Sequence, residues 1–141
     1  AVRAAVGSRI QRKRVHKMSE GKDAAEAGLA IMRKMFGASL VDERQAAATD
    51  FNRPLEDLVV RYCFGEVWSR PQLDRKTRSM LTLAVLTALG KPNQLKVHVQ
   101  AAVNNGVTQE EIREVLLHAT VYSGVPAGVE AFRVASEVLG A

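Results

Sequence analysis

The chain has 141 residues, 47% of them hydrophobic, which suits one domain with a buried core and is too short for two domains of ordinary size. Every apolar run falls short of the roughly 18 to 20 residues that a membrane span needs, so we expect no membrane partner. The single cysteine, Cys63, excludes an intrachain disulfide and a Cys-x-x-Cys redox pair, and it favours a reducing cytoplasmic location.

The formal net charge of +5 comes from the N-terminal segment. Six of the 20 lysines and arginines and none of the 15 acidic residues lie in residues 1–17, so the rest of the chain is nearly neutral. A nucleic-acid arm or an organelle presequence is possible only there, and we expect no nucleic-acid partner. Because Met18 opens a normally mixed sequence, we expect residues 1–17 to be a disordered leader or a non-native extension, and residues 18–141 to form a single domain.

Helical periodicity dominates the chain, and no segment shows the alternating pattern of a strand. The first predicted helix begins near residue 23 and ends at Gly37, a typical position for a left-handed backbone. Residues 42–50 predict a short polar helix. Asn52 is expected to cap a longer helix that ends at Arg70, because a residue before proline avoids the helical region. The predicted buried stripe of that helix comprises Leu55, Leu58, Val59, Tyr62 and Cys63.

The next predicted helix starts at a capping Asp74 and ends at Gly90. It is apolar on most sides between Met80 and Leu89, so we expect it to be the central buried helix. Its predicted core positions are Thr77, Met80, Leu81, Ala84, Val85 and Ala88.

Three further helices are predicted over residues 91–104, 108–122 and 127–139. The second of them starts with a Thr-x-x-Glu capping box at Thr108 and Glu111. Together these elements predict an all-α fold, a compact bundle of six or seven helices.

Several short motifs in a fixed order make the sequence similar, from Gly28 to the C-terminus, to the carboxymuconolactone decarboxylase family. Each motif alone is weak, and their order makes the resemblance specific. The motifs are Phe64 to Pro71, Leu73 to Ser79, Leu95 to His98, Asn104 to Thr108, Glu110 to Val115, and Tyr122 to Ala127.

The resemblance implies the helical fold of alkylhydroperoxidase D, assembled as a homotrimer or a homohexamer. Alkylhydroperoxidase D carries a Cys-x-x-Cys pair just before the histidine that matches His98. Residues 91–94 hold no cysteine here, so thiol peroxidase activity is excluded because there is no resolving thiol.

The implied activity is the cofactor-free decarboxylation of 4-carboxymuconolactone to the 3-oxoadipate enol-lactone, a step of protocatechuate catabolism in the β-ketoadipate pathway. The departing carboxylate of that lactone is vinylogous to the ring carbonyl, so the electrons left by carbon dioxide can move onto the carbonyl oxygen. The protein then has to bind a small anionic lactone, stabilise an oxyanion and deliver a proton to carbon. We therefore expect neither a cofactor nor a metal.

The resemblance also implies two catalytic residues, His98 as general acid or oxyanion donor and Glu66 as an acid beside Trp68. Arginine suits a carboxylate substrate because it can form two parallel hydrogen bonds. The predicted substrate-binding residues are Arg70, Arg78, Trp68 and Tyr122, with Arg44 as a further candidate. Without the resemblance, a core histidine, a surface glutamate and a core tyrosine would be the default interpretations.

Two positions depart from the family pattern. Directly before the Leu95 to His98 motif, family members often carry a histidine or an aromatic residue and then a glutamate, where this sequence has Asn93 and Gln94. A glutamine cannot ionise to transfer a proton or to orient His98. Two alternatives therefore stay open: a related enzyme for another small lactone or β-keto acid, and a non-catalytic oligomeric binding protein.

Overall fold

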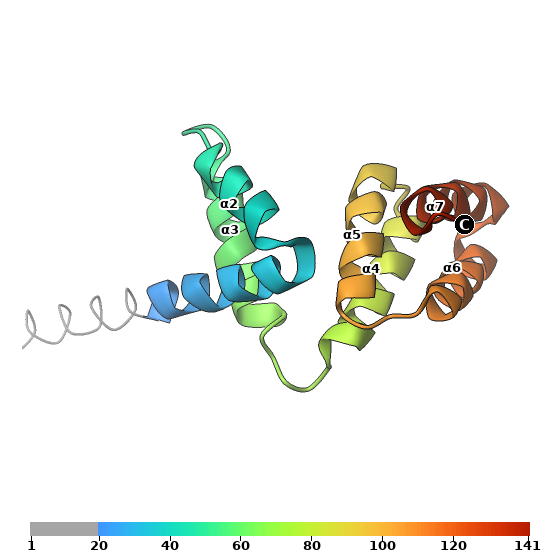
Figure 1. The fold of residues 1–141 in the computed structure, drawn as a ribbon, viewed down its shortest axis with the longest axis horizontal. Helices are drawn as coiled ribbons and strands as arrows, with labels where there is room; N and C mark the ends of the chain where they lie inside the picture. The colour runs from blue at the N-terminus through green and yellow to red at the C-terminus, as the bar shows by residue number, and fades with distance from the viewer. Residues whose placement is uncertain (1–19) are drawn as a thin grey trace, which may run out of the picture. The chain divides into compact units, whose positions relative to one another are not determined.

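The computed structural model describes residues 20–141, which form two compact units (Figure 1). Unit 1 contains residues 20–33 and 38–70, and unit 2 contains residues 34–37 and 71–141. Every regular element in the described range is helical, which confirms the predicted all-α fold. The single domain over 18–141 remains a prediction, and the basic segment 1–17 lies outside the described residues.

The helices of unit 1 follow the predicted order with shifted boundaries. The first covers residues 20–36 and ends where Gly37 takes a φ of 92°. The others are α2 (Ala38–Ala46), α3 (Arg53–Leu58) and the π-helix η1 (Val59–Val67). The polar helix predicted over 42–50 therefore starts and ends four residues earlier. The Asn52 side chain accepts the Thr49 N–H at 2.7 Å, and such a local bond competes with helix just before α3.

The helix predicted after Asn52 forms as α3 and continues directly into η1. Its predicted buried stripe is wrong, because Leu55, Leu58 and Tyr62 are exposed whereas Glu56, Val60 and Phe64 are buried. Part of the reason is that η1 is a π-helix, in which an N–H bonds to the carbonyl five residues earlier. The Trp68 N–H, for example, donates to the Cys63 carbonyl at 2.9 Å. A π-helical turn holds more residues than an α-helical turn, so α-helical spacing assigns the wrong inward face.

The inward face of α3 is fixed by an ion pair rather than by an apolar stripe. Arg44 of α2 donates two hydrogen bonds to Glu56, at 2.8 and 2.9 Å, and Glu56 is buried. A buried carboxylate needs such a partner, because removing it from water without one is costly. Arg44, a candidate for substrate binding from the sequence, is thus engaged in joining α2 to α3.

Two glycines allow the helix over 20–36 to cross η1 with backbone against backbone. A Cβ on Gly65 would lie 2.1 Å from the Ala24 carbonyl oxygen, and a Cβ on Gly28 would lie 1.9 Å from the Val60 carbonyl oxygen. No other residue fits either position without moving a helix. This crossing fixes the position of η1, which carries the predicted site residue Glu66 and ends directly before Trp68.

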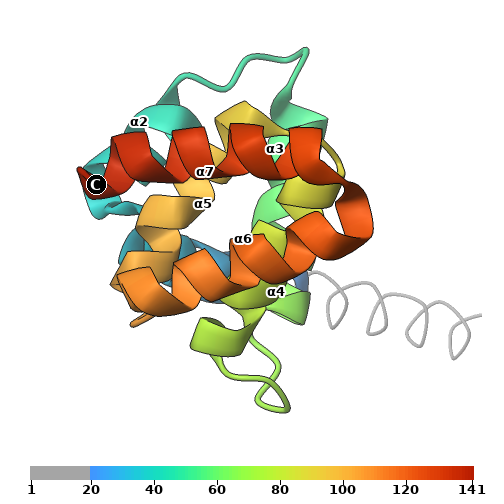
Figure 2. The same ribbon diagram turned by 90° about the vertical axis from the view of Figure 1, so that its right-hand side faces the viewer.

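Unit 2 is built from residues 34–37 and four helices joined by short turns (Figure 2). The helices are α4 (Arg75–Ala88), α5 (Pro92–Asn104), α6 (Gln109–Ser123) and α7 (Val125–Leu139). They enclose one apolar core, whose fully buried members include Leu83, Leu95, Val99, Ala102, Ile112 and Leu116. No helix of the described residues is long and apolar enough to cross a membrane.

Two predicted caps of unit 2 are confirmed. The Asp74 side chain accepts the Thr77 N–H at 2.7 Å, and Thr108 and Glu111 form the complete capping box with bonds of 2.9 and 3.1 Å. Helix α7 begins two residues before its predicted start at residue 127, since Pro126 fits the first turn of a helix, where no N–H is needed.

The predicted core face of α4 is wrong at three of its six positions, whereas Met80 packs against the core as predicted. Leu81, Val85 and Ala88 are exposed, whereas Ser79, Leu83 and Thr87 are buried. Because α4 is apolar around most of its circumference, its periodicity does not select one face. The two hydroxyls can be buried because both are hydrogen-bonded: Ser79 accepts from the Asn105 side chain at 2.9 Å, and Thr87 donates to the Leu83 carbonyl at 2.8 Å.

We predict that Gly65→Ala destabilises the protein by about 1–3 kcal/mol or more, since an added methyl group forces the backbones at the crossing apart. Gly21→Ala is the matched control on the helix over 20–36, because the nearest atom to its added Cβ is the end of the Arg61 side chain at 3.9 Å. That variant should keep or raise stability, as alanine favours a helix. Chemical denaturation followed by circular dichroism measures both, and equal midpoints for the two variants would contradict the close crossing.

Candidate functional site

His98 lies in the middle of α5 and is partly buried. The Phe36 ring meets its imidazole edge to face, with ring centroids 5.4 Å apart and an interplanar angle of 89°. Burial lowers the pKa of His98 below its ordinary value, because an imidazolium loses hydration there. The imidazole is therefore neutral near pH 7, with one nitrogen as a donor and the other as an acceptor.

Phe36 reaches His98 because residues 34–37 pack with α5 in unit 2. The Asn104 side chain, at the end of α5, donates a hydrogen bond of 2.7 Å to the Met35 carbonyl. Met35 itself is fully buried. Phe36 was not predicted from the sequence. The only feature that marks it there is its position directly before Gly37, where the helix ends.

Glu66, Trp68 and Arg70 lie close in sequence at the C-terminal end of η1 and in the turn that follows it in unit 1. Trp68 is buried and packs against Phe64, with ring centroids 5.6 Å apart, whereas Glu66 and Arg70 are exposed. The Ser69 hydroxyl donates to the Gly65 carbonyl at 2.6 Å and so closes the last turn. The chain leaves the helix with an anchored indole flanked by an accessible carboxylate and an accessible guanidinium.

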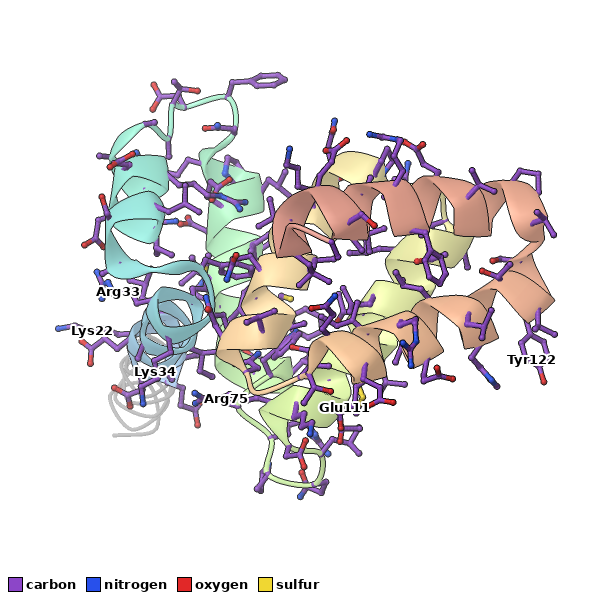
Figure 3. All side chains as sticks on the ribbon, turned by 45° about the vertical axis from the view of Figure 1, so that its right-hand side comes forward. Lys22, Arg33, Lys34, Arg75, Glu111 and Tyr122 are labelled. Carbon is purple, nitrogen blue, oxygen red and sulfur yellow. The ribbon has the colours of Figure 1, made fainter. Side chains whose placement is uncertain are left out.

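The other two predicted residues lie on different helices of unit 2. Arg78 stands in the first turn of α4, and its Nε donates to the Leu73 carbonyl at 3.2 Å. Tyr122 lies near one end of α6, with Glu111 near the other end, and its side chain points away from the other helices (Figure 3). Tyr122 is 81% exposed, and its ring contacts His118 at a centroid distance of 5.1 Å.

A groove of about 680 Å³ runs between α4 and α6 of unit 2. Glu114 is the one charged residue among those lining it, and His118 is the one histidine. The other lining residues are Thr77, Met80, Leu81, Ala84, Val115, Leu117 and Val121. An apolar groove with a carboxylate and no lysine or arginine does not suit a dianionic substrate.

Metal and thiol chemistry find little support in the part of the chain that the structure describes. Residues 20–141 contain no cluster of three or more histidine, cysteine, aspartate or glutamate side chains that could hold a metal ion. Cys63 is partly buried, and burial raises the pKa of its thiol. A protonated thiol is a poor nucleophile.

The comparisons with known proteins agree with the motifs in the sequence. The sequence profile of the carboxymuconolactone decarboxylase family matches residues 53–137. The chain is 42% identical to the 4-carboxymuconolactone decarboxylase of Acinetobacter baylyi over 111 residues, which is 79% of this chain and 83% of that protein. It is 40% identical to the nitrosuccinic acid decarboxylase of Metarhizium robertsii over 114 residues, which is 81% of this chain and 80% of that one.

Both relatives cover most of this chain and both are named decarboxylases, which confirms the predicted carboxy-lyase class. The range matched by the family profile includes the end of η1 and the whole of α5, where Glu66 and His98 lie. Motifs, helical fold and similarity thus agree, and the chain belongs to the carboxymuconolactone decarboxylase family.

Proposed function

We propose that this enzyme decarboxylates 4-carboxymuconolactone to the 3-oxoadipate enol-lactone without a cofactor, as a cytoplasmic step of protocatechuate catabolism. The observation that carries the proposal is a partly buried His98, whose pKa is lowered by burial, in a chain 42% identical to an enzyme named for this substrate. The substrate supplies its own electron sink, so the protein needs only to bind it, stabilise charge and transfer a proton.

The reaction starts when the bond between the ring carbon and the carboxylate breaks and carbon dioxide leaves. The electron pair moves through the ring to the lactone carbonyl oxygen, which becomes an oxyanion. We assign the N–H of neutral His98 as the donor to that oxygen. A donor in a partly buried, apolar setting stabilises developing charge more strongly than one in water, because the local dielectric is lower.

The proton that completes the reaction goes to carbon, and we assign its delivery to Glu66. His98 is already assigned as the donor to the oxyanion, so the transfer of the proton to carbon is given to the other catalytic residue that the resemblance implies. Glu66 is exposed at the end of η1, so it can exchange protons with water between turnovers.

The remaining predicted residues bind the substrate in this proposal. Arg70 and Arg78 pair with its two carboxylates, while Trp68 and Tyr122 line the site. The nitrosuccinic acid decarboxylase relative favours a second candidate, a small acid whose own nitro or carbonyl group accepts the electrons. Gln94, in place of the common glutamate, keeps that candidate open together with the non-catalytic binding protein.

We further propose that the enzyme assembles as a homotrimer or homohexamer, with a second copy of the chain covering the groove between α4 and α6. Helix α4 presents apolar side chains to the groove, among them Met80, Ala84 and the half-exposed Leu81. A contiguous apolar surface of this kind is typical of a protein–protein contact. The groove lacks the cations that the anionic substrate requires, so a protein surface suits it better.

The proposed role of His98 predicts that His98→Ala loses most turnover, by about 100-fold to 1000-fold in kcat as for removal of an oxyanion donor. Lys96→Ala is the control, because Lys96 is exposed on the same helix and pairs with Glu137. The decay of the muconolactone ultraviolet absorbance measures the turnover of both variants. Nitrosuccinate is tested separately as a second substrate. No muconolactone turnover by the unaltered enzyme would refute the proposed substrate, and an active His98→Ala variant would refute the site.

The lowered pKa of His98 predicts the direction of the pH dependence. If the neutral imidazole is the working form, kcat/KM falls as pH drops through a midpoint below about 6.5. A profile that instead falls as pH rises through this midpoint would identify imidazolium as the working form. The same shift lowers stability below about pH 6.5, because the unfolded chain binds the proton more tightly.

The proposed interface predicts that Leu117→Glu lowers the assembly mass, because it places a carboxylate beside Glu114 in the groove. Phe51→Glu is the control, since Phe51 is 97% exposed in unit 1 and does not line the groove. Light scattering during gel filtration measures the mass of each variant. An unchanged mass for Leu117→Glu would rule out this groove as the contact surface.

A further inference from the structure

The Asn104-Asn105-Gly106 segment at the end of α5 has no role in the proposed reaction, yet its two asparagines bind different parts of unit 2. The Asn104 side chain donates to the Met35 carbonyl at 2.7 Å, across 69 residues of sequence. The Asn105 side chain donates to the Ser79 hydroxyl at 2.9 Å. Asn104 thus reaches residues 34–37, and Asn105 reaches α4.

The bond from Asn104 lies one residue from the aromatic ring that covers His98. The Met35 carbonyl belongs to the last turn of the helix over 20–36, where carbonyls have no partner within the helix. Met35 is fully buried, so its main chain has little room to move. Phe36 follows directly and places its ring edge to face on the imidazole.

The same bond is supported from α5 itself. The Asn104 side-chain oxygen accepts a hydrogen bond from Gln100 at 3.3 Å, one turn earlier on the helix. This bond orients the amide so that its NH₂ group faces the Met35 carbonyl. His98 and Asn104 lie on the same helix, α5, so their separation is set by that helix. The bond from the Asn104 amide to the Met35 carbonyl therefore helps to set the distance between Phe36 and the imidazole.

We propose that Asn104 is a positioning residue for His98: it holds the Met35 carbonyl so that the Phe36 ring stays against the imidazole and keeps water from it. The inference rests on the proposed function for its effect on catalysis. Burial lowers the pKa of His98, so displacement of the Phe36 ring would admit water and raise that pKa toward its ordinary value.

A purely structural role for Asn104 is the main alternative, and Asn105 supplies the matched control. Each side chain donates one hydrogen bond of similar length to another part of unit 2, and both substitutions to alanine leave the charge of the protein unchanged. Asn104 also accepts the exposed bond from Gln100, so Asn104→Ala should lose at least as much stability as Asn105→Ala, for which one hydrogen bond is worth about 0.5–1.5 kcal/mol. Only the Asn104 bond leads to Phe36 and His98.

The experiment is an NMR titration of the His98 imidazole in the full chain, with its signal assigned by its absence from His98→Ala. We expect Asn104→Ala to raise the pKa of His98 toward its ordinary value and Asn105→Ala to leave it unchanged. With substrate, kcat of Asn104→Ala should fall by up to about 100-fold, the scale of a small misplacement of a reacting group. An unchanged pKa in Asn104→Ala, or an equal rise in Asn105→Ala, would overturn the proposal.

A second variant keeps the test decisive if Asn104→Ala folds poorly. Phe36→Leu removes the ring and leaves the Asn104 bond in place, so it should also raise the pKa of His98. If Asn104 acts through Phe36, the effects of the two substitutions on that pKa do not add in the double variant, whereas full additivity would contradict the inference. The titration needs no substrate, so it separates a failure of this inference from a failure of the proposed reaction.

Discussion

The Phe36 ring against the His98 imidazole is the contact on which the proposed chemistry depends. It removes water from one side of a histidine that stands in the middle of a rigid helix. Burial then lowers the pKa of that histidine, and a neutral imidazole can donate a hydrogen bond where an imidazolium would act as an acid. Reaction type, pH dependence and the role of Asn104 all follow from whether this contact keeps the imidazole neutral.

Unit 1 positions its residues by a different constraint, which is close contact between main chains. Gly28 and Gly65 let two helices cross without side chains between them, and the Arg44–Glu56 pair holds α2 to α3. The π-helix η1 takes part in the crossing through Gly65 and ends directly before Trp68, which packs against Phe64. Glu66 lies near the end of this helix and Arg70 just after it, and both are exposed.

Local signals predicted the helices of unit 2 well, because caps such as Asp74 and the Thr108–Glu111 box act within four residues. Inward faces were harder to predict. The exposed Leu81 on α4 and Leu55 on α3 show that apolar periodicity fails where a helix is apolar all round or where a polar pair such as Arg44–Glu56 is buried. The resemblance supplied His98, whereas Phe36 could not be predicted, because its role depends on a bond between residues 69 positions apart.

His98 is proposed to work as a neutral donor to an oxyanion. The most direct measurement is the ¹⁵N chemical shift of His98 in enzyme saturated with tetronate, a stable enolate of a five-membered lactone that resembles the intermediate. If His98 is a neutral donor, one ring nitrogen is protonated near pH 7, and its ¹⁵N resonance is shifted by a hydrogen bond to the bound oxyanion. Two protonated nitrogens, or no response of His98 to the bound anion, would contradict it.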